Sequence, residues 1–369
     1  MKTIFQRLQN GNDVRGAAIA TEKEPQTLTP VLAAWIARAF MEDLAQQTGK
    51  DASDLKIGLG HDSRITAEEL MDACCIGMEK AQVFDCGLIT TPAMFQSVLL
   101  PESRFDGSIM ITASHLPFNR NGLKFFTGQG AISHADLDRI LDLAVKLAGS
   151  AEEPVMPEAE AVRRENFDMQ GLYAKHMKQL IRGAVGAKDQ ALPLSGLHIV
   201  VDSGNGASGF FATRILEELG ADISGSQFLE PDGRFPNHIP NPENEEAMFS
   251  IRQAVLASNA DLGVIFDCDG DRGAVVFADG TEVNRNTLIA LLSAIVAEEA
   301  PGSWIVTDSV TSDELHDFLT QDLGLQHLRF QRGYKNVIDR GVLLNEQGER
   351  CELAIETSGH GAFRENIFR

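Results

Sequence analysis

The amino-acid sequence predicts an α/β protein made of consecutive units whose sheets are mixed and largely parallel. The main observation is that short apolar runs, typical of buried strands, repeatedly end in loops rich in Gly and Asp and are followed by helix-like segments. The second is length, because 369 residues correspond to about two or three domains of roughly 100–200 residues each. The third is an acidic segment with two prolines, AEEPVMPEAEA, which is typical of a linker.

The first unit is expected over residues 1–155. Its apolar run LKIGLG predicts a buried strand, which leads into the loop HDSR and then into the helix-like ITAEELMDACCIGMEKA. A second apolar run, FDGSIMI, leads directly into TASHLPFNRNGLK. The unit ends at the acidic segment 151–161, which we interpret as the linker.

The second unit is expected over residues 160–285. The helix-like FDMQGLYAKHMKQLI precedes two predicted strands, LHIVVD and ADLGVIF, which end in the loops SGNGASG and DCDGDR. The first of these loops leads into the helix-like FFATRILEELG, and the second into a predicted hairpin with an Asp-Gly turn at 273–284. In α/β folds such loops beyond the carboxyl ends of strands form the ligand sites, so these are the segments to search for chemistry.

The third unit is expected over residues 286–369. The helix-like RNTLIALLSAIVAEEA precedes the predicted strand SWIVTD and the helix-like SVTSDELHDFLTQDLG. The last stretch, LAIETSGHGAFRENIFR, contains no helix that would close the unit. We therefore expect the third unit to be truncated.

The composition disfavours several classes of function. The chain has 53 acidic and 32 basic residues and a net charge of −21, which disfavours nucleic acid and anionic membranes as partners. No segment approaches the ~20 apolar residues that span a bilayer, and the N-terminal MKTIFQRLQNGNDVRG lacks the apolar core of a secretion signal. The five cysteines are scattered without a CxxC pair, which indicates buried thiols rather than disulfides or structural zinc. We expect a soluble cytoplasmic protein.

The loop DCDGDR places three carboxylates at alternate positions, on Asp267, Asp269 and Asp271. With a glycine that permits a tight turn, they can converge on one hard divalent cation. A calcium loop of the EF-hand type is excluded by spacing, because Arg272 stands where that loop needs glycine and Ala278 where it needs glutamate. The alternative is a polar turn without metal, but three acids held together would repel one another, so Mg²⁺ is favoured. Arg272 beside the acids also indicates a nearby phosphate.

The loop after LHIVVD contains G-x-G-x-x-G at Gly204, Gly206 and Gly209, with Asp222 further along. This spacing matches a dinucleotide-binding fingerprint, which would suggest a nicotinamide-dependent oxidoreductase. A tight strand-to-helix turn explains the pattern equally well. The rest of the chain offers no residues for hydride transfer, so we disfavour the oxidoreductase.

Charged residues that can bind anions or carry protons lie on several other loops. They are Arg15, Asp62, Arg64, Lys124, Arg332, Lys335, Glu356 and His360. Each alone is more simply a solvated residue or part of a strand-end turn. Together with the Asp cluster they favour a site for phosphorylated sugars, where cations hold phosphate and His and Lys carry protons.

Ser114 lies directly beside His115, which invites comparison with a serine hydrolase. No G-x-S-x-G elbow surrounds Ser114, and a histidine adjacent in sequence is seldom the partner of a catalytic serine. A carrier of a transferable group is the better interpretation.

Three motifs together, TASHLPFNRNGLK, DCDGDR and ETSGH, resemble in order and spacing the α-D-phosphohexomutases. GNDVRG and GHDSR are similar to two further loops of that family, and the resemblance runs from about residue 10 to residue 369. It implies three consecutive α/β/α sandwich domains. It further implies a magnesium-dependent enzyme that moves phosphate between O1 and O6 of a hexose phosphate, through a phosphoserine and a bound hexose 1,6-bisphosphate.

The resemblance also implies a role for each loop residue. Ser114 would be the phosphoserine and, with Asp267, Asp269 and Asp271, would hold the metal. Lys124 would be the general base, and His360 a second proton carrier. The residues that would line the phosphoserine are Arg15, Arg64, His115 and Arg272, and those that would bind the sugar phosphate are Glu356, Ser358, Arg332, Tyr334 and Lys335.

The sequence also departs from the family pattern. Leu116 replaces the usual Asn after the Ser-His pair, and Arg120 stands where an aromatic residue is common. Nothing corresponds to the family's fourth domain, whose loop clamps the non-reacting phosphate. The alternative is therefore a non-catalytic sugar-phosphate-binding homologue, although retention of Ser114, Lys124 and His360 favours the enzyme. In either case the expected partners are small hexose phosphates of the glucose or mannose type.

Overall fold

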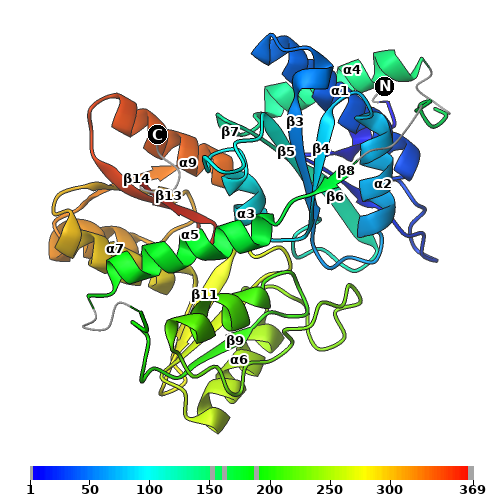
Figure 1. The fold of residues 1–369 in the computed structure, drawn as a ribbon. Coiled ribbons are helices and arrows are strands. Elements are labelled where there is room, and N and C mark those ends of the chain that lie inside the picture. Colours follow the sequence, from blue (N-terminus) through cyan, green and yellow to red (C-terminus); the bar gives the residue numbers. More distant parts are fainter. Residues whose placement is uncertain (1–2, 150–153, 160–163, 187–190, 365–369) are drawn as a thin grey trace.

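The computed structural model describes residues 3–149, 154–159, 164–186 and 191–364 (Figure 1). Three separate sheets follow one another along the chain. In Figure 1 the first unit lies at the upper right, the second below it and the third at the left, while helix α5 (Met169–Ala184) runs between them. Within these described residues, no helix is both long and apolar enough to cross a membrane.

The sheet of the first unit has eight strands in the order β1-β2-β6-β5-β3-β4-β8, with β7 paired to β6. Strands β3, β4, β5 and β8 pair in parallel, and the remaining pairs are antiparallel. The strands are β1 (Gln9–Asn10), β2 (Asp13–Ala17), β3 (Lys56–His61), β4 (Gln82–Leu88), β5 (Gly107–Ile111), β6 (Arg120–Thr127), β7 (Gly130–Ala131) and β8 (Arg164–Asn166). The helices are α1 (Pro30–Thr48), α2 (Ala67–Gly77), α3 (Thr91–Gln96) and α4 (His134–Ala148).

Local sequence explains how the helices of the first unit begin and end. Helix α1 starts at Thr29, whose hydroxyl accepts the N–H of Leu32, and ends at Gly49 in the left-handed conformation. Helix α4 starts with a capping box formed by Ser133 and Asp136. Helices α1, α2 and α4 bury one face of the sheet in a single core, and α3 with the start of α5 covers the other.

The second unit has a four-stranded sheet in the order β12-β11-β10-β9. Its strands are β9 (Ile199–Asp202), β10 (Leu262–Phe266), β11 (Gly273–Phe277) and β12 (Glu282–Val283), and only the β9–β10 pair is parallel. Helix α5 and the π-helical segment η3 (Phe211–Leu216) pack on one face, and α6 (Glu245–Ser258) on the other. The predicted hairpin at 273–284 is confirmed, because Val275 pairs with Val283.

The third unit has a four-stranded sheet in the order β14-β13-β15-β16. Its strands are β13 (Trp304–Asp308), β14 (Gln326–Phe330), β15 (Cys351–Ile355) and β16 (Gly361–Phe363), and only the β15–β16 pair is antiparallel. Helices α7 (Arg285–Glu299) and α8 (Asp313–Asp317), with the π-helical segment η5 (Phe318–Asp322), cover one face, and α9 (Tyr334–Glu346) covers the other. All three units are thus α/β/α sandwiches, as predicted.

Two sequence-based expectations differ from the structure or lie partly outside it. The helix-like FFATRILEELG folds as η3 followed by a 3-10 turn, η4 (Glu217–Leu219), instead of one regular α-helix. The predicted linker 151–161 lies within the described residues only at 154–159. All five cysteines are free and buried, as expected. The unit boundaries proposed from sequence stay predictions.

Candidate functional site

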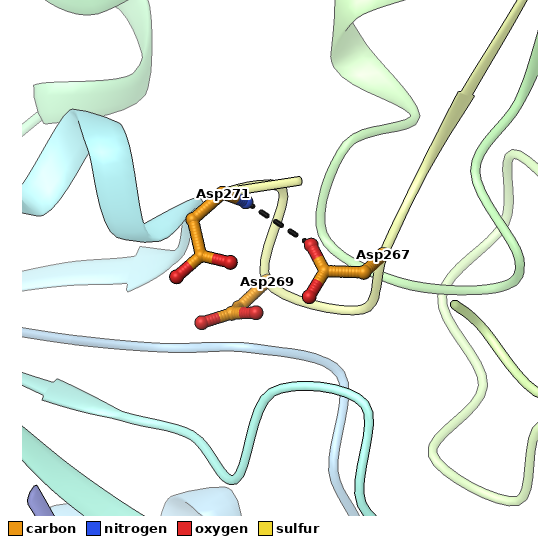
Figure 2. A group of neighbouring side chains, drawn as sticks. All are labelled: Asp267, Asp269 and Asp271. Carbon is orange, nitrogen blue, oxygen red and sulfur yellow. Dashed lines mark hydrogen bonds between the residues drawn. The ribbon is translucent and has the colours of Figure 1, made fainter. Parts of the chain in front are cut away.

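Three carboxylates converge in the loop between β10 and β11 (Figure 2). Asp267, Asp269 and Asp271 each offer one oxygen, and these oxygens lie within 4.8 Å of one another. The loop can turn this tightly because Gly270 has a φ of 68°, which glycine adopts without strain. Asp267 Oδ1 accepts the backbone N–H groups of Asp271 and Arg272, each at 3.1 Å, and so fixes the turn.

Lys124 on β6 balances part of the negative charge of these three acids. Its Nζ lies 2.8 Å from Asp269 Oδ2 and 2.6 Å from Asp271 Oδ2. Burial alone would lower the pKa of Lys124, but the two carboxylates raise it well above its ordinary value, so the ammonium form is favoured. For Asp267, burial and the two other carboxylates hold the pKa well above the usual range. The three carboxylates therefore repel one another, and a bound cation would reduce this repulsion.

The donor set of the three acids fits a hard divalent cation. Asp269 Oδ1 is buried and has no hydrogen-bond partner among the described residues. Such an orphaned oxygen is costly unless a ligand satisfies it. Carboxylate oxygens are the ligands that Mg²⁺ prefers in proteins, so the triad can hold a metal ion.

Ser114 lies beside the triad, in a turn that follows β5. Its Oγ donates to Asp267 Oδ2 at 3.0 Å, although the two residues are far apart in sequence. The φ of Ser114 is 53°, a left-handed conformation that is uncommon outside glycine. Its backbone N–H donates to Thr112 Oγ1 at 2.7 Å, which helps to hold this conformation. The sequence prediction that Ser114 meets the Asp cluster therefore agrees with the geometry.

His115 lines the cleft beside Ser114. Its Nδ1 lies 3.4 Å from Ser114 Oγ. Burial, followed by the positive charges of Arg272 and Arg15, lowers the pKa of His115 to about 4. A neutral imidazole can donate its N–H to a phosphate oxygen but adds no positive charge.

Arg64 differs from its predicted place against the phosphate. Its side chain is fully buried and paired with Asp62, with 3.2 Å between Nε and Oδ2. Its other nitrogens donate to backbone carbonyls of the Ser114 loop, at Ser114, Leu116, Pro117 and Arg120. These bonds use all the N–H donors of the guanidinium, so Arg64 supports the loop and has no donor left for a phosphate. The motif GHDSR drew attention to Asp62 and Arg64, but it did not indicate the backbone carbonyls to which Arg64 donates.

Arg15 and Arg272 lie where the sequence predicts cations for a phosphate. Both line the same cleft as His115. Arg15 pairs with Asp13 at 2.8 Å, and Arg272 lies 3.6 Å from Glu243 and 3.9 Å from Asp267. The Nε atom of each guanidinium is buried and without a hydrogen-bond partner among the described residues, so both retain donor capacity.

The loop ETSGH of the third unit contacts the loop of the second unit that carries Asp267, Asp269 and Asp271, here called the metal loop. His360 Nε2 lies 2.9 Å from Asp271 Oδ1, and the ring of Tyr334 stacks on His360 at 5.2 Å between centroids. Ser358 Oγ lies 3.1 Å from His360 Nδ1 and donates to Glu356 Oε2 at 3.3 Å. Glu356 Oε1 accepts the N–H of Gly333 at 2.7 Å, which joins ETSGH to the RGYK loop. The two predicted sugar-binding loops therefore form one surface.

All three units contribute side chains to one cleft of about 550 Å³. The predicted residues that line it are Arg15, His115, Lys124, Arg272, Arg332, Tyr334, Lys335, Glu356, Ser358 and His360. Ser114 and Asp267 are fully buried next to it. Cations, carboxylates and hydroxyls thus surround a space large enough for a small polar ligand.

The G-x-G-x-x-G loop of the second unit has a packing explanation. A Cβ on Gly206 would lie 2.4 Å from the carbonyl oxygen of Cys268, and one on Gly209 would lie 2.1 Å from that of Leu229. Both glycines are therefore required by neighbouring backbone. This supports the tight-turn interpretation of the motif.

Sequence reasoning missed two residues beside the triad. Thr91 Oγ1 donates to Asp269 Oδ2 at 2.6 Å, and its backbone N–H donates to the Asp269 carbonyl at 2.8 Å. Glu243 lines the cleft next to Arg272. Thr91 follows β4, so its position at the carboxyl end of a strand was the available signal. Glu243 offered no comparable signal.

Comparison with known families gives three consecutive matches. Residues 6–148, 172–280 and 284–368 match the models for phosphoglucomutase/phosphomannomutase alpha/beta/alpha domains I, II and III, respectively. These matches include every motif described above. They leave short intervals between them, near residues 149–171 and 281–283.

Individual relatives agree with these matches. The chain is 30% identical over 365 residues to a phosphomannomutase/phosphoglucomutase from Pseudomonas syringae pv. tomato, covering 96% of this chain and 69% of that protein. It is 30% identical to a phosphoglucosamine mutase from Salinispora tropica, covering 96% of this chain and 73% of that protein. A crystal structure of a phosphoglucomutase/phosphomannomutase family protein from Burkholderia thailandensis matches with a TM-score of 0.79 at 27% identity, covering 99% of this chain and 73% of that one.

Proposed function

This chain belongs to the phosphoglucomutase/phosphomannomutase family of hexose-phosphate mutases, and we propose that it moves phosphate between O1 and O6 of glucose or mannose phosphate. The reaction would use a phosphoserine at Ser114 and a bound hexose 1,6-bisphosphate. One observation carries the proposal. Ser114 Oγ lies 3.0 Å from a carboxylate of the metal-binding triad, beside a cleft lined by cations from all three units.

The transfer itself has a simple balance. A sugar hydroxyl attacks the phosphorus on Ser114, the P–Oγ bond breaks, the hydroxyl proton leaves to a base and Oγ regains a proton. Because such transfers need mainly positioning and charge stabilisation, a site rich in cations suits them. Arg15 and Arg272 would neutralise the phosphoryl oxygens, since both line the cleft and the Nε atom of each has no hydrogen-bond partner among the described residues. His115, whose Nδ1 lies 3.4 Å from Ser114 Oγ, would contribute a hydrogen bond to the phosphoryl group.

Asp267, Asp269 and Asp271, together with the group on Ser114, would hold Mg²⁺. When bound, Mg²⁺ would offset the nearly two negative charges of the phosphoserine and part of the carboxylate charge that holds Lys124 as an ammonium. Lys124 would then take the proton of the attacking hydroxyl. Its place in the wall of the cleft supports this role, and the charges of Asp269 and Asp271 must be offset before its amine can accept a proton.

The third unit would bind the sugar. Glu356 and Ser358 are both less than one tenth exposed, and their side-chain oxygens can form hydrogen bonds with the ring hydroxyls. His360 would carry the proton when the bisphosphate has turned around, because it lines the cleft from the third unit and its Nε2 lies 2.9 Å from Asp271 Oδ1. Arg332, Tyr334 and Lys335 line the same cleft and would contact the phosphate that does not react.

The test combines turnover with modification of the serine. The protein is incubated with Mg²⁺, glucose 1-phosphate and a catalytic amount of glucose 1,6-bisphosphate, and glucose 6-phosphate is measured. Mass spectrometry then locates phosphate, which we expect on Ser114 and which Ser114→Ala should lack. Mannose 1-phosphate and glucosamine 1-phosphate, assayed in parallel, identify the preferred sugar, since a phosphomannomutase/phosphoglucomutase and a phosphoglucosamine mutase are each 30% identical to this chain.

The alternative is a non-catalytic sugar-phosphate-binding homologue. It predicts saturable binding of glucose 1-phosphate without turnover, and an unmodified Ser114 after incubation with the bisphosphate. That pair of results would reject the mutase.

A further inference from the structure

Cys268 lies inside the metal loop, between two of the three acids, but its thiol bonds to the first unit. The side chain is fully buried, and Sγ lies 3.2 Å from Asp62 Oδ2. A thiol is the only donor in this pair, so the hydrogen bond runs from Cys268 to the carboxylate. The contact therefore joins the metal loop of the second unit to the loop that follows β3 in the first.

Asp62 is the centre of a buried hydrogen-bond network. Its exposure is 0%, and besides the thiol it accepts the hydroxyl of Thr112 at 2.7 Å. It also accepts the backbone N–H of Arg64 at 3.0 Å and the Nε–H of the same residue at 3.2 Å. These donors share one buried carboxylate, so the loss of one is expected to weaken the network as a whole.

Two of these donors lead directly to Ser114. Thr112 Oγ1 accepts the backbone N–H of Ser114 at 2.7 Å while donating to Asp62. Arg64 donates to the carbonyl of Ser114 and to other carbonyls of the same loop. Because Ser114 has a left-handed backbone conformation that costs free energy, these bonds are what hold it.

The loop that carries the acids and the loop that carries the serine therefore share one buried carboxylate. We infer that Cys268 is a positioning residue: its thiol fixes Asp62 and thereby holds Ser114 Oγ against Asp267. The inference rests on the proposed function for its catalytic consequence, but the geometric part concerns the chain alone. A purely space-filling role for Cys268 is the competing explanation.

Three variants separate positioning from packing. Cys268→Ala removes the donor, Cys268→Ser keeps a donor of the same polarity, and Cys351→Ala is the matched control. Cys351 is equally buried but lies in β15 of the third unit, where its thiol donates to the backbone carbonyl of Leu353, 3.7 Å away. Hydrogen exchange is measured by mass spectrometry on peptides that span residues 112–120 of the intact protein, alongside kcat, KM and the melting temperature.

We expect Cys268→Ala to speed amide exchange in residues 112–120 and to lower kcat roughly five- to tenfold, the effect of losing one hydrogen bond of ordinary strength, because a thiol is a weak donor. KM for the sugar phosphate should change less than about twofold, since the cleft residues stay in place. Cys268→Ser should restore both exchange and kcat to within about twofold of the parent protein. Cys351→Ala should match the parent in exchange over these residues.

Two outcomes would overturn the inference. Unchanged exchange over 112–120 in Cys268→Ala would show that the thiol does not hold the serine loop. Equal losses of kcat and melting temperature in Cys268→Ala, Cys268→Ser and Cys351→Ala would show ordinary loss of packing. If the parent protein has no turnover, the proposed function fails, whereas the exchange comparison still decides whether Cys268 positions the loop.

Discussion

Replacing Arg64 tests whether this arginine organises the serine loop or binds phosphate. Arg64→Met removes the guanidinium while keeping an unbranched side chain, and Arg15→Met does the same in the cleft. The geometry predicts that Arg64→Met mainly lowers the free energy of unfolding, whereas Arg15→Met mainly lowers turnover. The two variants remove the same charge, so net charge cannot explain a difference between them.

The magnitude follows from burial. The side chains of Arg64 and Asp62 are both 0% exposed, so Arg64→Met leaves a buried carboxylate without its cationic partner, which costs about 3–5 kcal/mol. The carbonyls of residues 114–120 that lose their donor add to this cost in the same direction. Arg15 is 14% exposed and pairs with Asp13 at the cleft, so we expect Arg15→Met to cost about 1–2 kcal/mol.

Urea denaturation followed by fluorescence measures this difference. The chain has two tryptophans, and Trp35 on α1 reports on the first unit. In a Trp304→Phe background the signal comes from Trp35 alone, and the parent in that background is the reference. If Arg64→Met is no less stable than Arg15→Met, the bonds from Arg64 to the serine loop do not hold the fold, and the assignment is wrong.

Three further perturbations give distinct results. Asp269→Asn removes a charged ligand, so the Mg²⁺ concentration for half-maximal turnover should rise at least about tenfold; an unchanged Mg²⁺ titration would contradict the metal site. Lys124→Met should lower kcat by roughly 10²–10⁴ with little change in binding of glucose 1-phosphate by calorimetry, and a change in affinity alone would argue against a proton-carrying role. Burial lowers the pKa of His327 to about 4, so the folded third unit favours the neutral imidazole. The free energy of unfolding that depends on this group is therefore fully present above about pH 6.5 and falls as the pH is lowered toward 4. Urea midpoints followed by Trp304 should therefore depend less on pH in His327→Gln, and an unaltered dependence would refute the assignment.

The α/β architecture could be predicted because buried strands and glycine-rich loops are local features of sequence. The structure differs from the prediction where a segment expected to be a regular α-helix forms a different pattern of backbone hydrogen bonds. The stretch FFATRILEELG has helical periodicity, but apolar spacing does not distinguish the regular α-helical pattern from the π-helical bonds of η3. The segment around η5 shows the same effect after α8.

The candidate site was predictable to the extent that its chemistry lies within single loops. Asp267, Asp269 and Asp271 meet because one turn brings alternate positions together, and that turn can be recognised from its glycine. The partners of Arg64 are backbone carbonyls, which every residue has, so nothing in the sequence marks them. Thr91 could not be predicted for a similar reason, because its role depends on the loop of the second unit that carries Asp269 and packs against it.

The three acids depend on different units for their hydrogen bonds, and this has a consequence for catalysis. Asp267 accepts from Ser114 and Asp269 from Thr91, both in the first unit, whereas Asp271 contacts His360 of the third. Lys124 bridges the last two acids, so a displacement of the first unit from the third would separate partners on both sides of the metal loop. A ligand that bridges the cleft stabilises the arrangement in which the acids converge, because it binds that arrangement better than the separated one. Under the proposed function, sugar-phosphate binding and assembly of the metal site would therefore be linked, and each should strengthen the other.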